Sequence, residues 1–505
     1  MIFKRIKYFS TAMILTFITY TSCNEDILNT KPNSLTEADY FENELEFQRG
    51  VVAVYAKLHG IYWWNGGTPT PPLWQLPADD ITTIGSGGQH VYFETFNGLS
   101  AGNGVLNNYY NSAYELILRA NLMLQKLEEA EEGIFTTPGM RDFNKGEVLF
   151  LRGFMFFHLW NVFGNAPLIT ERAASLNDIF PFASEGTQLL DQAIAGFTEA
   201  AALLPPTWDE GNRGRVTKNS AYAFLGKALV FRGTVNDSDA DLTAAITAFD
   251  NISGASLVDF EDNFAGVAEN NAESLFEYQA SSAATEENIW LPDEFNNAVG
   301  STSSAAIMPF EGAENYGYGG QPFIATEKLL NAFEADDPRL PLTLDPATRR
   351  INKYVLGNVK TVNNLSSMNN DRILRYADVL LLKAEAILQS GGSNADAIAL
   401  INQIRERARN IDGGSAPADL NTGETDDATV MQWIMDERFR ELAFEAGIRW
   451  FDLKRWHEAG YITLDDAFFD SDNPNFDIEV PKHLSFPIPT SETDRNTNIA
   501  PNPDY

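Results

Sequence analysis

Apolar residues recur with helical spacing along most of this chain. Residues 107–130 carry one stripe of apolar positions three or four apart, and residues 142–163 and 217–232 are typical of helices that face a core. The same spacing predicts helices over residues 42–59, 184–204, 241–250, 326–333, 371–392 and 394–410. Consecutive helices follow one another closely, so the pattern predicts a mainly α fold built from helix pairs.

Two long segments lack this period. Residues 60–104 are rich in glycine, proline and aromatic residues, and residues 253–368 read as short strands between loops. Long irregular segments inside a compact domain usually carry function. We therefore expect a helical scaffold with a loop-rich, irregular part that bears short strands and the ligand site.

Residues 437–456 are dense in both charge and aromatic side chains. Met435, Phe439 and Leu442 form an apolar helix stripe, and Gly447 is a natural helix stop. Arg438, Glu441 and Glu445 share a neighbouring face, where opposite charges can pair. We interpret the stretch as a partly buried ion-pair network that serves structure, although catalysis would use such groups too. Arg375, Asp378 and Glu385 predict a similar helix-face charge cluster.

This stretch resembles the C-terminal motif of the SusD/RagB family. The motif positions are matched by Glu437, Arg438, Glu441, Leu442, Glu445, Gly447, Arg449, Asp452, Leu453, Arg455 and Trp456, with Ala446 as an extra residue. Residues 147–168, 214–231, 375–386 and 484–505 resemble further family segments. The resemblance implies tetratricopeptide-like helix pairs as the scaffold, divided into an N-terminal part (23–235) and a C-terminal part (236–505) of one integrated unit.

The N-terminus reads as an export signal. Residues 4–7 are mostly cationic and residues 8–19 form an apolar run too short to span a bilayer. The single cysteine, Cys23, follows this run, either as a chance free thiol or as the lipid-bearing residue of a bacterial lipoprotein; its position favours the lipoprotein. We predict a signal peptide over residues 1–22. Glu25 and Asp26 resemble the acidic signal for the outer face of the outer membrane.

The net charge of the chain argues against two classes of binding partner. The 505 residues carry a net charge of −34, which makes nucleic acid and anionic membrane surfaces poor partners. The same charge favours a neutral ligand over an anionic one. A flexible tether and a lipid anchor would hold the protein at the outer membrane, facing outside.

Catalytic and metal motifs are nearly absent from the sequence. It has no G-x-S-x-G elbow, P-loop or H-E-x-x-H helix, and its five histidines are scattered. Asp79 and Asp80 are the best candidate for a glycosidase pair, with turn chemistry as the alternative. The aspartates at 237, 239 and 241 start like a calcium loop but favour a helix-entry turn; a structural calcium stays open. We expect no cofactor and no metal at the ligand site.

The nine tryptophans divide into two groups. Those in helical or motif segments, Trp160, Trp433, Trp450 and Trp456, are expected in the core. Those in loops can stack their π-face on the apolar face of a sugar ring, while nearby polar groups bind the hydroxyls. With Trp64 and Trp290 first, the candidate ligand residues are Trp63, Trp64, Asn65, Trp74, Asp79, Asp80, Gln89, His90, Trp290, Asn315, Tyr316 and Tyr318.

The resemblance implies a function without bond cleavage. A SusD-type surface lipoprotein captures a polysaccharide or oligosaccharide and hands it to a SusC-like TonB-dependent outer-membrane transporter. The acidic composition and the tryptophan-rich loops favour a neutral glucan, with the β-1,3-glucan laminarin as the first candidate. The alternatives are a RagB-like peptide-uptake component and a surface glycoside hydrolase.

Overall fold

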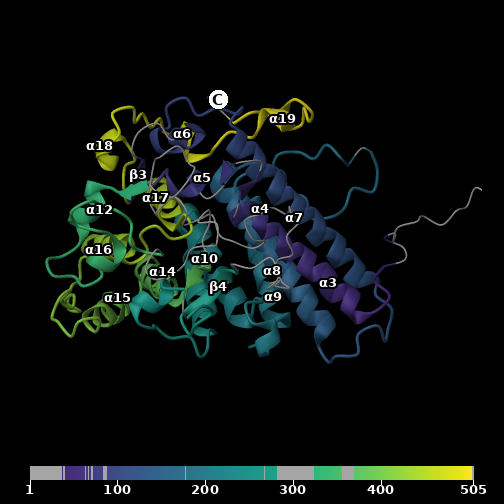
Figure 1. Ribbon diagram of the computed structural model, residues 1–505, viewed down its shortest axis with the longest axis horizontal. Coiled ribbons are helices and arrows are strands. Elements are labelled where there is room, and N and C mark those ends of the chain that lie inside the picture. Colours follow the sequence, from purple (N-terminus) through teal and green to yellow (C-terminus); the bar gives the residue numbers. More distant parts are fainter. Residues whose placement is uncertain are drawn as a thin grey trace, which may run out of the picture.

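The computed structural model describes residues 37, 40–62, 64–65, 68–69, 72–83, 88–176, 178–266, 268–280, 323–354, 369–502 and 505 (Figure 1). Its longer helices are α3 (Glu44–Tyr55), α7 (Gly104–Glu129), α8 (Met140–Phe163), α9 (Gln188–Leu203), α10 (Lys218–Asn236), α11 (Asp239–Asp250), α14 (Tyr376–Gln389), α15 (Asn394–Arg409), α16 (Asp427–Glu441) and α17 (Ile448–Glu458). No helix of this described part is both long and apolar enough to cross a membrane.

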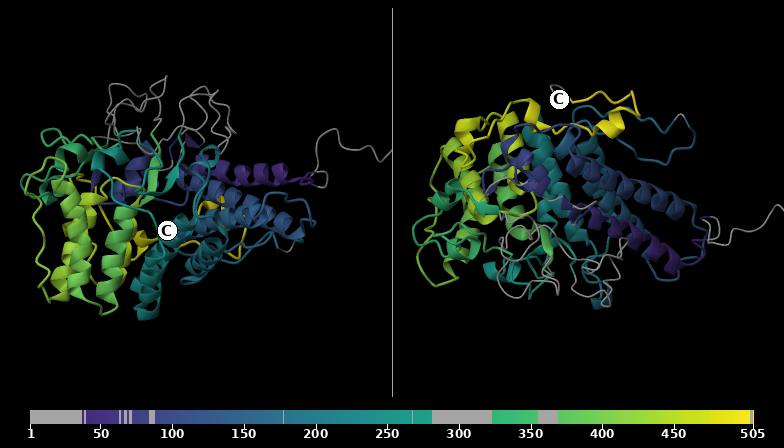
Figure 2. Two further views of the ribbon diagram at one scale, coloured as in Figure 1. Left: turned by 90° about the horizontal axis from the view of Figure 1, so that it is seen from below. Right: turned by 45° about the horizontal axis from the view of Figure 1, so that its top comes forward.

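Helices that follow one another in sequence pack together. The pairs α7 with α8, α8 with α9, α10 with α11 and α14 with α15 are in close contact. Figure 2 shows the C-terminal helices (green to yellow) on one side of the molecule and α3, α7 and α8 (purple to blue) on the other. The prediction of a mainly α, helix-pair scaffold is confirmed, because the apolar stripes of these helices face a shared core.

Short helices complete the connections between the long ones. They are α4 (His59–Tyr62), α5 (Pro72–Gln75), α6 (Val91–Thr95), α12 (Glu327–Ala332), α13 (Leu340–Thr343), α18 (Asp466–Phe469) and α19 (Thr490–Thr493). The 3-10 turns are η2 (Ala56–Leu58), η3 (Gly88–His90), η4 (Glu210–Asn212), η5 (Phe260–Asn263) and η7 (Lys482–Leu484). Ser238 caps α11 and places Asp239 and Asp241 in its first turn, as the helix-entry interpretation predicts.

The strands are short and pair two by two. β1 (Trp64–Asn65) pairs with β2 (Thr68–Pro69), β3 (Ile81–Thr83) with β5 (Phe323–Ala325), and β4 (Ser274–Tyr278) with β6 (Asp371–Arg375), all antiparallel. The predicted helix over residues 371–392 is wrong in its first turn, because β6 occupies residues 371–375. Its backbone bonds to β4, a partner that lies about a hundred residues away and leaves no local pattern.

One hydrophobic core runs through both parts of the chain. It includes nearly all of α8 as well as Trp450 and Trp456, which are 1% and 0% exposed, as predicted for these two tryptophans. Trp160 and Trp433 are only partly buried at its edge. Helices α10 and α11 pack against each other across the predicted boundary at 235/236.

The turn before α17 differs from the predicted helix stop. Helix α16 already ends at Glu441, and Gly447 precedes α17 with a φ of +71°. Phe444 and Ala446 also have positive φ, so the extra residue of the family motif lies in a tight turn. A Cβ on Gly447 would come within 2.5 Å of the Trp74 ring, and glycine is therefore required by packing as well as by φ.

Candidate functional site

The two predicted ligand segments leave the scaffold from one place. In the pair of β3 and β5, Thr83 lies opposite Phe323. Residue 84 follows Thr83, and residue 322 precedes Phe323. Thr326 stabilises this strand pair from its other end. Its hydroxyl donates to the Asp79 carbonyl at 2.7 Å, and its amide donates to the Asp80 carbonyl at 3.0 Å. Thr83 and Phe323, the described residues next to segments 84–87 and 281–322, therefore lie side by side.

Described residues that flank three irregular segments meet near β4 and β6. The Ala280 amide donates to Asn370 Oδ1 at 2.7 Å, and Asn369 Nδ2 donates to the Tyr354 carbonyl at 3.3 Å. The Tyr62 ring stacks on Tyr278 with centroids 5.5 Å apart. Segments 63–71, 281–322 and 355–368 thus begin or end here. We call residues 62, 83, 278–280, 323, 354 and 369–371 the anchor region.

Most of the predicted glycan-contacting side chains lie outside the described residues. These are Trp63, Trp64, Asn65, Trp290, Asn315, Tyr316 and Tyr318, of which Trp64 and Asn65 have a described backbone in β1. Their role stays a prediction. What the anchor region adds is proximity between two segments that are far apart in sequence. Tyr62, just before the segment with Trp64, stacks on Tyr278, close before the segment that carries both Trp290 and Tyr316.

Trp74 lies in the core and not at the surface where the sequence analysis placed it. It belongs to α5, is 1% exposed, and packs edge-on against Tyr62, Tyr109 and His158 at centroid distances of 5.9, 5.5 and 5.7 Å. Because the indole ring of Trp74 is buried on all sides, neither of its faces can stack on a sugar ring. The proline-rich surroundings of Trp74 suggested a loop, but the turn at Gly447 folds over it.

Asp79 and Asp80 are buried beneath the anchor region. Asp79 accepts from Arg449 Nε at 2.6 Å and Nη2 at 2.9 Å, and pairs with Lys328 Nζ at 2.8 Å. Burial alone would raise the pKa of Asp79, but the attraction of Arg449 and Lys328 lowers it to about 2. Asp79 therefore ties β3 to α17 and α12 as a permanent anion.

The pKa of the neighbouring carboxyl group, Asp80, is shifted in the opposite direction. Its Oδ2 accepts from the Phe444 amide at 2.8 Å, and burial raises its pKa to about 7. A cavity of about 10 Å3 adjoins it. That space holds roughly one water molecule and no sugar ring. The prediction that Asp80 contacts a ligand is not supported by this placement, because its carboxyl faces the core.

Gln89 and His90 lie in η3 at the start of the next helical region. Gln89 is exposed, and its Oε1 accepts from the Gly104 amide at 3.0 Å, so it helps to cap α7. His90 is 7% exposed and also lies apart from open surface. Gln89 is thus engaged at the start of α7, and His90 is buried rather than offered to a ligand at the surface.

The family-motif stretch forms the centre of a buried ion-pair network. Glu437, Glu441 and Glu445 are fully buried and accept from cations, most of which come earlier in the chain. Glu441 pairs with Arg375 at 2.7 Å, with Arg339 at 3.0 Å and with Arg407. The other pairs join Glu437 to Arg339, Arg405 and Arg440, and Glu445 to Lys353 and Arg375.

A second group of buried pairs links α16 to α14, α10 and α17. Arg438 binds Asp378 and Asp452, each at 2.7 Å, and Asp378 also binds Lys227 at 2.9 Å. Arg455 binds Asp452 and Glu385. The structural interpretation is thus supported, but the predicted local pairing of Arg438 with Glu441 is wrong. The partners are carboxylates on other elements, because full burial leaves no charge without a close counter-charge.

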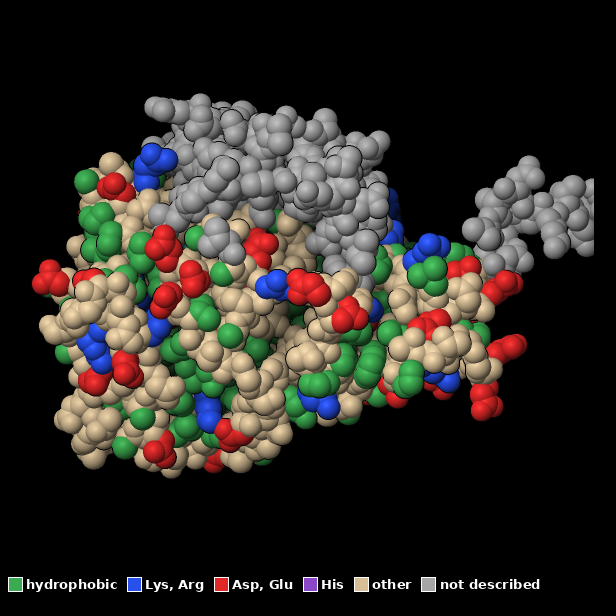
Figure 3. All heavy atoms as spheres, turned by 60° about the horizontal axis from the view of Figure 1, so that its bottom comes forward, with side chains coloured by type: hydrophobic (Ala, Val, Ile, Leu, Met, Phe, Trp, Pro, Cys, Tyr) green, Lys and Arg blue, Asp and Glu red, His purple; other side chains and the backbone are tan. Residues whose placement is uncertain are grey.

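Charge on the surface is mixed. Figure 3 shows acidic side chains scattered over one face with basic ones between them, and no basic patch gathers among the described residues in this view. Groups of three or more His, Cys, Asp or Glu placed to hold a metal ion are also not found in the described part of the chain.

Two family models match separate parts of the chain. The model of the SusD family matches residues 345–505, and a model described as starch-binding, associating with outer membrane, matches residues 86–229. Together these spans cover more than half of the chain. The chain belongs to the SusD/RagB family. The first span contains Glu437, Glu441 and Glu445 of the buried network, and the second contains α7, α8 and α9.

Relatives cover nearly the full length of this SusD/RagB chain. SusD-like protein P2 of Formosa agariphila is 24% identical over 98% of the chain and 99% of its own length. A SusD superfamily protein from Bacteroides vulgatus matches 92% of the chain and all of its own with a TM-score of 0.70 and 26% identity. A laminarin-binding SusD-like protein matches to the same extent, with a TM-score of 0.71 and 24% identity.

Proposed function

We propose that this protein is a surface glycan-binding lipoprotein that captures a neutral polysaccharide and passes it to a SusC-like TonB-dependent outer-membrane transporter. Acylation at Cys23 would anchor it in the outer membrane, facing outside. The observation that carries the proposal is the anchor region, from which the segments bearing Trp64, Trp290, Tyr316 and Tyr318 all emerge. Aromatic rings gathered there would form a platform for sugar stacking.

The ligand is a glucan, with laminarin as the first candidate. The support is the fold shared with a laminarin-binding SusD-like protein, together with the net charge of −34, which repels polyanions. The family description, starch-binding, makes the α-glucan starch the natural comparison. The two glucans differ in linkage alone, so they test the proposal against the same chemistry.

The proposed mechanism is binding without cleavage. Retaining and inverting glycosidases both need two carboxyl groups that flank the scissile bond. Asp79 is held as an anion by Arg449 and Lys328, and Asp80 adjoins a cavity of about 10 Å3, so this pair has no room for substrate. Asp79 and Asp80, the pair considered for hydrolysis, are therefore better explained as residues that stabilise the fold.

Native affinity electrophoresis tests the proposal. The chain from residue 24 onward keeps every described residue and is run in gels that contain laminarin, starch, levan, xylan, alginate or mannan. We expect retardation by laminarin, loss of retardation in Trp64→Ala and Trp290→Ala, and no new reducing ends in solution. Trp433→Ala, which removes a partly buried tryptophan from α16, is the matched control.

The outcomes are distinct. Retardation by starch alone would keep the glycan-binding function and replace the ligand. Release of reducing ends that disappears in Asp79→Asn would favour a glycoside hydrolase. Migration unaffected by all six polymers would refute glycan binding at this site, and binding of mixed oligopeptides would then favour a RagB-like role.

A further inference from the structure

Four large apolar side chains are exposed on the connection between α8 and α9. Leu176, Ile179, Phe180 and Phe182 are 81%, 49%, 45% and 74% exposed, and none of them is among the described side chains that pack on the hydrophobic core. We call these four side chains the loop patch. Covering them would bury on the order of 500 Å2. Exposed apolar surface of that extent often marks an interaction site.

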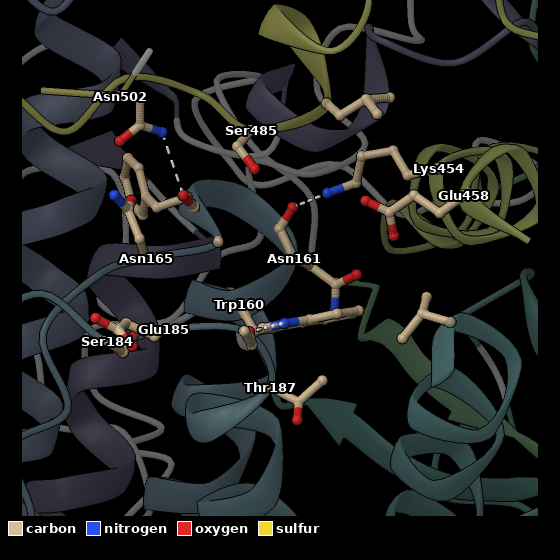
Figure 4. Close-up of a pocket in the computed structure, with 15 residues that line it drawn as sticks. Trp160, Asn161, Asn165, Ser184, Glu185, Thr187, Lys454, Glu458, Ser485 and Asn502 are labelled. Atoms are coloured by element: carbon tan, nitrogen blue, oxygen red, sulfur yellow. Dashed lines mark hydrogen bonds between the residues drawn. The ribbon is translucent and has the colours of Figure 1, made fainter. Parts of the chain in front are cut away.

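The backbone beneath the loop patch is held by side chains from other elements. Two asparagines of the C-terminal tail, Asn498 and Asn496, donate to the carbonyls of Phe180 and Pro181, each at 2.7 Å. Nearer to α9, Trp160 Nε1 donates to a carbonyl of the same connection at 3.1 Å (Figure 4). Because polar contacts fix this backbone, the fold itself presents the apolar side chains outward.

The connection also lies beside the first described residue of the chain. Arg172 donates to both carboxylate oxygens of Glu37, at 2.8 and 3.1 Å, and Lys126 of α7 pairs with Glu37 at 3.2 Å. Glu37 comes fourteen residues after Cys23, and Arg172 comes four residues before Leu176. Fourteen residues reach at most about 50 Å, and four reach at most about 14 Å. An acyl chain on Cys23 would therefore keep this end of the molecule close to a membrane.

The size and shape of the loop patch favour a lipid surface over a protein partner or a second copy of this chain. A standard protein interface buries about 800 Å2 on each side and needs a surface of matching shape. The loop patch offers less area, and in Figure 1 its connection projects from the body of the molecule beside α7. A lipid surface needs no matching shape, and apolar and aromatic side chains insert at its headgroup boundary. An anchor also raises the effective concentration of lipid at the loop patch, so a small contact suffices.

Charge around the loop patch selects the kind of lipid surface. Residues 171–187 contain three carboxylates and a single cation, Arg172, which is paired with Glu37. Recognition of anionic lipids relies on clusters of lysine and arginine, which this stretch lacks in its sequence. The loop patch would therefore bind by burying apolar side chains in a neutral or zwitterionic surface, and salt would not weaken the contact.

We propose that the loop patch inserts into the lipid surface that carries the Cys23 anchor. The inference rests on the lipoprotein function proposed above and adds a second point of attachment to it. Two points of attachment fix which side of the protein faces the membrane, whereas an anchor alone leaves the protein free to rotate on its tether.

Hydrogen exchange followed by mass spectrometry tests this proposal on the chain from residue 23 onward. Cys23, its one cysteine, is coupled to a maleimide phospholipid in phosphatidylcholine vesicles, and the same protein with a blocked Cys23 stays free in solution. We expect amides of residues 173–183 to exchange at least about threefold more slowly on the vesicles. The slowing should persist in about 1 M NaCl, because it does not depend on charge.

Two double variants distinguish the loop patch from other exposed apolar side chains. Leu176→Gln with Phe182→Gln should abolish the slowing and keep the melting temperature, because both side chains are largely exposed. Ile411→Gln with Tyr461→Gln is the matched control: these exposed side chains follow α15 and α17, and their loss should leave the slowing intact.

Each remaining outcome would overturn the proposal. Equal exchange on vesicles and in solution would show that lipid does not cover the loop patch, and slowing found only in native outer membranes would assign it to a protein partner. Slow exchange already in the free protein would mean that another part of the chain covers it. Slowing that survives Leu176→Gln with Phe182→Gln would place the contact elsewhere. Mass spectrometry of the native protein tests acylation of Cys23 separately, so failure of the anchor and failure of the loop patch are distinguishable.

Discussion

Glu441 is the carboxylate whose loss should damage the fold most. Its side chain is 0% exposed and lies among the guanidinium groups of Arg339, Arg375 and Arg407. Burial alone would raise the pKa of Glu441, but these cations hold it well below its usual range. Glu441→Gln keeps the shape of the side chain, yet it removes the charge and turns an amide N–H₂ toward groups that can only donate.

The expected cost follows from one buried positive charge left in excess. Each arginine keeps another carboxylate in Glu441→Gln: Arg339 keeps Asp337 and Glu437, Arg375 keeps Glu273 and Glu445, and Arg407 keeps Glu273. These carboxylates already share other cations, so they do not replace the lost charge. Removing one partner of a buried ion pair typically costs about 3–5 kcal/mol. That is a large share of a total stability on the order of 5–15 kcal/mol. We therefore expect a clearly lower midpoint of urea unfolding for Glu441→Gln.

Equilibrium unfolding in urea, followed by far-UV circular dichroism, measures this cost. The matched control is Glu406→Gln on the neighbouring helix α15, where the carboxylate is exposed; its effect should stay within about 0.5 kcal/mol. A Glu441→Gln protein within about 1 kcal/mol of the wild type would refute the reasoning that Glu441 neutralises buried cations. A changed slope would point instead to a change in the compactness of one state.

Two further predictions concern the turn before α17 and the nearby carboxyl group of Asp80. Gly447→Ala should lower the free energy of unfolding in urea by about 2–5 kcal/mol, because alanine is strained at positive φ and its Cβ would displace Trp74. Gly460→Ala is the control: its φ is +79° but the space around it is open, so it should cost about 1–2 kcal/mol, and equal costs would contradict the packing argument. Burial raises the pKa of Asp80 to about 7, from its ordinary 3.8. Between pH 4 and 7 the folded protein therefore keeps a proton that the unfolded chain has released. As a result, the free energy of unfolding falls as pH rises through that window. Asp80→Asn should therefore melt like the wild type near pH 4 and be more stable by on the order of 2–4 kcal/mol at pH 8, and a gap that does not grow with pH would refute the assignment.

The long helices could be predicted from sequence because their apolar spacing is a local property. Residues 142–163 and 394–410 were predicted, and α8 and α15 differ from these ranges by no more than two residues at either end. The strand β6 could not be predicted, because α14 follows it directly with no glycine, proline or other turn residue between them. Only its pairing with β4, from a distant part of the chain, distinguishes it.

The candidate site was less accessible to sequence reasoning. Charge on residues 437–456 indicated an ion-pair network, but the partners Arg339, Lys353, Arg405 and Arg407 carry no local signal. Trp74 resembled a surface aromatic because proline and glycine surround it, yet tertiary packing buries it. Trp160 shows the reverse case: its apolar helix predicted the core, and the end of that helix leaves the ring beside a cavity.

The order of charges along the chain has a consequence for synthesis. Arg339, Lys353, Arg375 and Arg407 all leave the ribosome before Glu437, Glu441 and Glu445, which neutralise them in the folded protein. Asp337 and Glu273 are made earlier and pair with Arg339, Arg375 and Arg407, but the acceptors of Lys353 are Glu445 and the carbonyls of Glu441 and Ala443. Burying Lys353 before these acceptors are made is costly. We therefore expect a chain halted before residue 437 to be more open to proteases around Lys353 than the complete protein.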